Sequence, residues 1–155
     1  MNFQVTAIDR KAFEHLFAKS EKELEALGAK KMSVDAYPGF PCRVSLEDVP
    51  IGEEVILLSH PFHEVSSPYR ASGPIFVWIN ATTAQLPLNK LPEMLFKREQ
   101  SLRAYNAKGM MLSGVTATTG DLEEKLQSLL SMEGVRYVDA HNAKPGCFNC
   151  RIFLV

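Results

Sequence analysis

The chain of 155 residues is 46% hydrophobic and 23% charged, which is typical of one globular domain large enough to bury a full core. Its net charge of −1 excludes a general electrostatic attraction to nucleic acids or anionic membranes, so we expect neither as a partner. The sequence starts with no signal peptide and has no apolar run near the length of a membrane span; with its three cysteines, this predicts a single cytoplasmic domain over residues 1–155.

The N-terminal region predicts a strand followed by two short helices. Residues 3–8 alternate weakly between apolar and polar side chains, as a strand does, and Asp9 suits the N-cap of a helix. Ser20 and Glu23 have the spacing of a capping box, and Gly28 is placed to end this second helix.

The middle of the chain predicts strands around one long loop. Residues 30–35 and 42–46 predict short strands, separated by a turn rich in proline and glycine. Residues 55–58 and 75–79 are apolar on both faces, which is typical of central strands in a covered sheet. Between them, residues 60–73 predict a long loop, and long ordered loops often carry function.

The second half of the chain predicts further strands and two helices. The expected helices span residues 92–99 and 121–132, and the expected strands span residues 102–107, 110–118, 135–141 and 150–155. Strands and helices do not alternate strictly along the chain. We therefore predict an α+β fold with a largely antiparallel sheet and three or four helices.

The cysteines suggest a metal or redox site. Cys147 and Cys150 have the C-x-x-C spacing that lets two sulfurs bind one metal or form a redox pair. A zinc site needs two more ligands, for which Cys42 and His141 are the first candidates. The alternative, which we favour, is that Cys42 and Cys150 are small buried apolar residues. No cofactor other than zinc is suggested.

A second candidate for chemistry lies around His141. This histidine shares a predicted strand face with Asp139, and Cys147 follows across a Pro-Gly turn. An imidazole oriented by a carboxylate could take the proton of a nucleophilic thiol, so His141 and Cys147 are candidate catalytic residues. A purely structural histidine is the alternative.

The arginines suggest an anion-binding pocket. No Asp or Glu lies near Arg70, Arg103 or Arg151 in the sequence, so each must pair with a distant acid, face solvent or bind an anionic ligand. Ion pairs within the protein are the alternative. The predicted ligand-binding residues are Arg70, Ser72, Arg103, Tyr105, Asn142 and Arg151.

Four stretches of sequence carry most of these polar residues. They are PGFPCRVSLED (residues 38–48), PYRASGPIFV (68–77), SLRAY (101–105) and HNAKPGCFNCR (141–151). Together they resemble a bacterial family catalogued as domain of unknown function 1203. The family has no assigned activity, but shared polar residues on loops and strand ends imply a common pocket. Asn106 stands where the family has an aspartate, so the resemblance does not carry a carboxylate role over to this position.

We therefore expect a small-molecule domain, binding or enzymatic, with an anionic ligand in an arginine-lined pocket. One alternative is a structural zinc module that uses Cys42, His141, Cys147 and Cys150. Another is an interaction protein without a pocket, which exposed side chains of Trp78, Phe62 and Tyr37 in one patch would favour.

Overall fold

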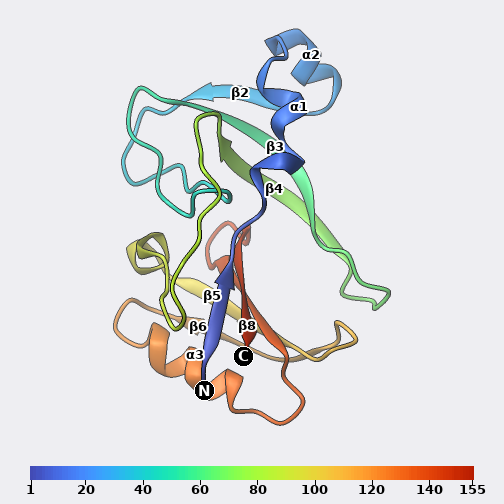
Figure 1. The fold of residues 1–155 in the computed structure, drawn as a ribbon, viewed down its shortest axis with the longest axis vertical. Helices are drawn as coiled ribbons and strands as arrows, with labels where there is room; N and C mark the ends of the chain where they lie inside the picture. The colour runs from blue at the N-terminus through green and yellow to red at the C-terminus, as the bar shows by residue number, and fades with distance from the viewer.

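The computed structural model describes residues 1–155 and contains two antiparallel β-sheets, placed one above the other along the long axis of the molecule (Figure 1). The lower sheet has the strand order β1-β8-β7-β5-β6, and the upper sheet has the order β2-β3-β4. The lower strands are β1 (Phe3–Thr6), β5 (Gln100–Tyr105), β6 (Met111–Ala117), β7 (Tyr137–Asn142) and β8 (Phe148–Leu154). The upper strands are β2 (Lys30–Ser33), β3 (Glu54–His63) and β4 (Ala71–Trp78).

The helices are short and cover less of the chain than the strands do. They are α1 (Glu14–Phe17), α2 (Glu21–Ala26), α3 (Leu122–Leu130) and the 3-10 turns η1 (Arg10–Ala12) and η2 (Glu93–Lys97). The capping box of Ser20 and Glu23 is formed at the start of α2, as predicted. None of the helices has the length and apolar character needed to cross a membrane. The α+β prediction with largely antiparallel pairing is confirmed.

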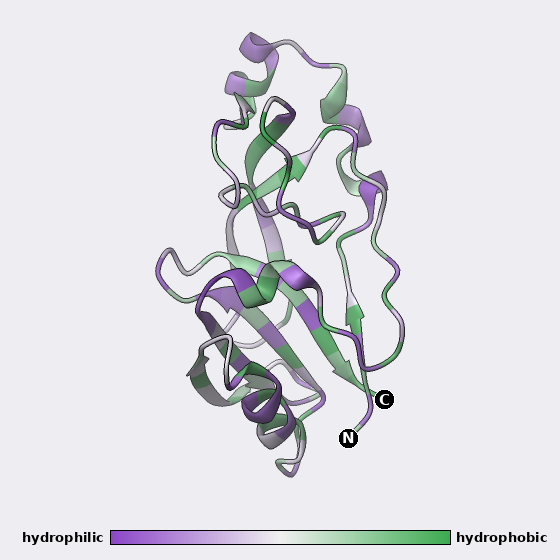
Figure 2. Ribbon diagram, turned by 90° about the vertical axis from the view of Figure 1, so that its left-hand side faces the viewer, coloured by the Kyte–Doolittle hydropathy of each residue, from purple (hydrophilic) through white to green (hydrophobic).

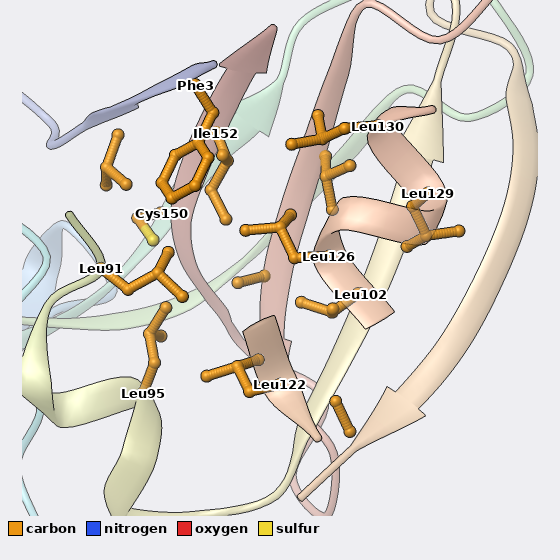
Figure 3. Packing of buried hydrophobic residues seen from close by; sticks show 14 of the residues in the cluster. Phe3, Leu91, Leu95, Leu102, Leu122, Leu126, Leu129, Leu130, Cys150 and Ile152 are labelled. Atoms are coloured by element: carbon orange, nitrogen blue, oxygen red, sulfur yellow. The ribbon is translucent and has the colours of Figure 1, made fainter. Parts of the chain in front are cut away.

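The lower core lies between α3 and one face of the five-stranded sheet. Leu122, Leu126 and Leu130 point from α3 onto Leu102 of β5 and Ile152 of β8, and all five are almost completely buried (Figure 3). Spacings of three and four residues bring these leucines to one side of the helix. In Figure 2 the sheets carry long hydrophobic stretches, whereas the helices at both ends of the molecule show hydrophilic sides.

The upper core fills the space between the three-stranded sheet, the two N-terminal helices and the loop that follows β2. Phe13 and Leu24 come from the helical region, Val55 and Val77 from the sheet, and Val44 from the loop. All five side chains are almost completely buried. The molecule therefore has two hydrophobic cores rather than one.

The β3–β4 hairpin connects the two sheets. It extends beyond the upper sheet and lies over the face of the lower sheet opposite α3 (Figure 1). The ring of Phe62 stacks on Phe148 of β8 with centroids 5.1 Å apart. His63 forms a hydrogen bond of 2.7 Å with the Tyr137 hydroxyl, and Arg151 donates to the Phe62 carbonyl at 3.2 Å. The lower sheet is thus covered on both faces.

Two predictions about the middle of the chain are wrong. Residues 42–46 form a tight turn instead of a strand, because the Leu46 N–H bonds the Cys42 carbonyl at 3.0 Å and Leu46 adopts a φ of 55°. Half of the predicted loop 60–73 is strand, and residues 64–70 lie outside β3 and β4. A register shift between His60 and His63 lets β3 continue past Pro61, which has no N–H to donate.

Candidate functional site

A cleft of about 610 Å³ lies where the turn between β7 and β8 meets the loop that follows β2. Its wall includes Gly39 and Arg43 from the first of the four sequence stretches, Phe76 from the second, and Asn142 and Cys147 from the fourth. Segments about 100 residues apart in the sequence therefore build one concave surface.

Arg43 is the central cation of this cleft, with 1% of its surface exposed. Its Nε donates to the Phe148 carbonyl at 2.6 Å, and a second guanidinium N–H donates to the Pro41 carbonyl. The Cys147 sulfur lies near this guanidinium, in the wall of the same cleft. Burial lowers the pKa of Arg43, and the nearby Cys147 sulfur opposes that shift. Arg43 thus fastens the loop to β8 and brings positive charge to the cysteine.

Cys147 is the only partly exposed cysteine, since Cys42 and Cys150 are buried. Its sulfur accepts a hydrogen bond from the Asn142 side-chain amide at 3.4 Å, and the Arg43 guanidinium lies near it. Reactive cysteines are found in such electropositive, partly exposed surroundings. The arrangement is that of a nucleophilic or anion-contacting thiol.

A buried network of amide side chains holds Asn142 in place. Asn149 donates to the Asn142 carbonyl oxygen at 2.7 Å and to the Gln100 side chain at 2.9 Å. Gln100 in turn donates to the Leu95 carbonyl at 3.2 Å. Because its oxygen is occupied, Asn142 presents its NH₂ group to Cys147.

The cleft carries more positive than negative charge. Its cationic side chains are Arg43, Lys97, Arg98 and Lys144, and its acidic side chain is Glu99. Arg98 is engaged by the buried Asp48 at 2.6 Å, so three cations face one acid once this pair is set aside. A cleft of this charge and size suits a small anionic molecule.

The other predicted ligand-binding residues do not join this cleft. Arg151 donates hydrogen bonds to both carboxylate oxygens of Asp139, at 2.7 and 2.9 Å. Arg103 donates to the Ser101 hydroxyl at 3.3 Å and has no acidic partner within salt-bridge distance. Arg70 and Ser72 are exposed on the β3–β4 hairpin. Asn142 is the member of the predicted set that lines the cleft.

His141 and Tyr105 lie on the opposite side of the sheet from α3, in a buried aromatic layer. The His141 Nδ1–H donates to the Gly146 carbonyl at 2.9 Å, and burial lowers the pKa of His141 to about 4. Tyr105 stacks on Tyr137 at 5.2 Å, and burial raises the pKa of Tyr105 to about 12. No hydrogen bond joins His141 to Cys147, and Asp139 orients Arg151 rather than His141.

The four candidate zinc ligands serve other contacts. The Cys42 sulfur accepts backbone N–H groups, including that of Trp78 at 3.3 Å, and Cys150 is packed in the lower core. No three His, Cys, Asp or Glu side chains in the chain are placed to hold a metal ion, so the zinc hypothesis gains no support.

The three aromatic side chains that would favour an interaction protein do not form one patch. Phe62 stacks between the sheets, apart from Trp78 and Tyr37, which line a second cavity.

The sequence analysis missed the cations Arg43, Lys97, Arg98 and Lys144 as members of one site. Arg43 and Phe148 are 105 positions apart, and no local pattern relates them. The sequence did place Arg43 and Cys147 in two of the four stretches that carry the family resemblance.

Comparison with known proteins gives a family without an activity. A family model described as "Protein of unknown function (DUF1203)" matches residues 39–153. That range includes Arg43, Asn142 and Cys147. None of the curated proteins matches the chain, and no solved structure does.

Proposed function

We propose that this chain, which belongs to the DUF1203 family of proteins of unknown function, binds a small anionic molecule in the cleft and presents the Cys147 sulfur to it as a nucleophile. The observation that carries the proposal is that a partly exposed thiol and a buried guanidinium lie near each other in the wall of one cationic cleft.

The charge of the cleft supports the choice of an anionic ligand. Lys97 and Lys144 are exposed at its rim, where they can attract an anion from solution. Arg43 lies deeper and its position is fixed by two carbonyl groups, so it needs no reorganisation to meet a ligand. The remaining N–H groups of its guanidinium can bind an anionic oxygen.

The surroundings of Cys147 support its role as the nucleophile. Asn142 donates a hydrogen bond to the sulfur, Arg43 places positive charge near it, and neither takes part in a competing acid pair. His141 does not contact the sulfur and takes no part in the proposed step. The Cys147 thiol gives its proton to solvent, and the resulting thiolate attacks an electrophilic carbon of the ligand. A carbon–sulfur bond forms as the bond to the leaving group breaks, and that group departs with its electron pair.

The test compares the alkylation rates of Cys147 by iodoacetate and by iodoacetamide. The two reagents have similar size and both lose iodide to a thiolate, but only iodoacetate is anionic. We expect folding to raise the ratio of the iodoacetate rate to the iodoacetamide rate about fivefold over that of the urea-unfolded chain, because one favourable charge contact is worth roughly 1 kcal/mol. Peptide mass mapping assigns the label to Cys147. Inorganic phosphate should slow the reaction of Cys147 with iodoacetate, because it competes for the same cationic cleft.

The controls separate cleft charge from general charge. Cys147→Ser should abolish the rapid labelling, and Lys144→Gln at the rim should lower the rate ratio. Lys22→Gln removes an equally exposed lysine from α2, far from the cleft, and should leave the ratio unchanged. A rate ratio that is the same in the folded and unfolded protein would exclude the proposed site.

A further inference from the structure

A second cavity, of about 650 Å³, lies on the other side of the Asp48–Arg98 ion pair. Asp48 lines this cavity, whereas Arg98 lines the cleft of Cys147, so the pair forms part of the wall between the two. The cavity is bounded by Ser45 of the tight turn and Asp48 just after it, by Trp78 at the end of β4, and by the segment around Leu91.

Two polar atoms in the wall of this cavity lack a partner in the protein. The Ser45 hydroxyl and the Oδ2 atom of Asp48 are both buried and make no hydrogen bond. The other carboxylate oxygen of Asp48 accepts from Arg98 at 2.6 Å and from the Gly39 N–H at 3.3 Å. Buried polar atoms are nearly always paired, so two unpaired ones in one cavity wall point to a hydrogen-bonding group from outside the protein.

Ser45 and Asp48 are three positions apart in the chain, and both line the cavity. Leu46 lies between them in sequence with a φ of 55°, a left-handed conformation that costs a leucine free energy. Its side chain is anchored in the lower core, which holds the turn in this shape. Strained residues of this kind are concentrated at functional sites.

The rest of the cavity wall is apolar and includes the single tryptophan of the chain. Trp78, Leu86, Leu91 and Ile51 supply apolar surface for the body of a ligand. Once the Asp48–Arg98 pair is set aside, the acids Glu47 and Glu93 balance the lysines Lys90 and Lys97, so this cavity lacks the positive excess of the cleft. Cavities of this type bind molecules with a polar head and an apolar body.

We propose that this cavity is a binding site for a small molecule with an ammonium or similar N–H donor group on an aromatic or aliphatic body. The Asp48 carboxylate oxygen can only accept a hydrogen bond while ionised, so the head group must donate. The Ser45 hydroxyl orients the same head group, and Trp78 contacts the apolar body. This site is separate from the proposed function and does not depend on it.

The test is a fluorescence titration of Trp78, which reports on the cavity alone because it is the only tryptophan. The probes are phenethylammonium and hydrocinnamate, which share an aromatic body and carry opposite charges. We expect a saturable change with phenethylammonium and at least about tenfold weaker binding of hydrocinnamate. No saturable change, or equal affinity for the two probes, would overturn the proposal.

The matched variants are Ser45→Ala and Ser128→Ala. Ser45→Ala should weaken phenethylammonium binding about fivefold, the effect of one lost hydrogen bond, and should not lower the melting temperature because the hydroxyl has no partner in the fold. Ser128→Ala, on the exposed side of α3, should not change binding. Unchanged binding in Ser45→Ala would contradict the assignment. The ratio of the iodoacetate and iodoacetamide rates at Cys147, measured in the same protein, tests the cleft separately. A failure of one proposal can thus be distinguished from a failure of the other.

Discussion

At the scale of single residues, His141 shows how burial determines the protonation state of a side chain. Its ring lies edge-on against both Phe62 and Phe148, which stack on each other, with centroid distances of 5.1 and 5.6 Å. Nδ1 donates to Gly146, and Nε2 has no partner in the protein. Burial disfavours the imidazolium form, so the ring is neutral near pH 7.

This residue should make the stability of the protein depend on pH. Its pKa falls from 6.5 in the unfolded chain to about 4 in the folded protein, so between these values the unfolded chain binds a proton that the folded one does not. The free energy of unfolding should therefore drop as the pH is lowered, by about 2.5 kcal/mol between pH 7.5 and 4.5. Urea unfolding of the wild type and of His141→Gln at both pH values measures the contribution of His141 to this loss of stability.

Comparison of the two proteins isolates His141 from His60, whose pKa is also lowered by burial. The wild type should lose more stability on acidification than His141→Gln does. An identical loss in both proteins would mean that His141 is protonated alike in the folded and unfolded states.

Asn106 has a structural role that accounts for its place in the chain. Its side-chain oxygen accepts the N–H groups of Lys108 at 2.9 Å and Met110 at 3.1 Å, which closes the turn between β5 and β6. A carboxylate can accept the same two bonds. The departure from the family's aspartate therefore leaves the turn intact and does not touch the cleft of Cys147.

At the scale of elements, strand register places a row of charges across the lower sheet. Arg103 of β5 is paired in register with Asp139 of β7, and Asp139 with Arg151 of β8. Asp139 is fully buried, and Arg151 also lies over the Tyr137 ring at 4.3 Å. Burial raises the pKa of Asp139, while the Arg151 guanidinium opposes that shift.

Breaking this ion pair should destabilise the sheet strongly. Asp139→Asn and Arg151→Met should each cost about 3 kcal/mol, because either change leaves a buried charge without its partner. The double variant should cost clearly less than the sum of the two single changes. Urea unfolding measures all three, and Lys31→Met in the exposed pair with Glu54 should cost less than about 1 kcal/mol. Additive costs would show that the two side chains act independently.

Elements with a local signature were predictable from the sequence. The capping box of α2 and the leucine spacing of α3 depend on residues three or four positions apart, and both are confirmed. The turn at residues 42–46 was not predictable in this way. Cys42, Val44 and Leu46 are all buried, as their alternation predicts, but alternation identifies buried side chains and not the backbone conformation that buries them.

The candidate site was only partly predictable for the same reason. Cys147 and Asn142 were identified because they belong to one short polar stretch. The partnership of Arg43 with Cys147, and that of Arg151 with Asp139, depends on which strands become neighbours. Sequence spacing does not encode that choice, since strand order is decided by tertiary packing.

At the scale of the whole molecule, the two sheets have separate cores but share side-chain contacts. Phe62 and His63 of the upper hairpin lie against the lower sheet, and Arg43 of the upper loop donates to Phe148 of β8. Loss of either sheet would expose these groups without their partners. The two cores are therefore expected to stabilise one another.

We predict that the two sheets unfold together in urea. Trp78 fluorescence follows the upper sheet, and near-ultraviolet circular dichroism of the tyrosines follows the stacked Tyr105 and Tyr137 of the lower sheet. Coincident midpoints and slopes are expected for a cooperative unit. Two separated transitions would show instead that the sheets are independently stable halves.

The pairing of β1 with β8 bears on how the chain acquires its structure during synthesis. The register joins Phe3 to Leu154, so β1 leaves the ribosome about 150 residues before its partner strand β8 and cannot pair until β8 has been made. The three upper strands lie within residues 30–78 and can assemble earlier. Throughout that interval the apolar side chains Phe3 and Val5 remain uncovered, which makes the nascent N-terminal segment a natural target for chaperones that bind exposed apolar stretches.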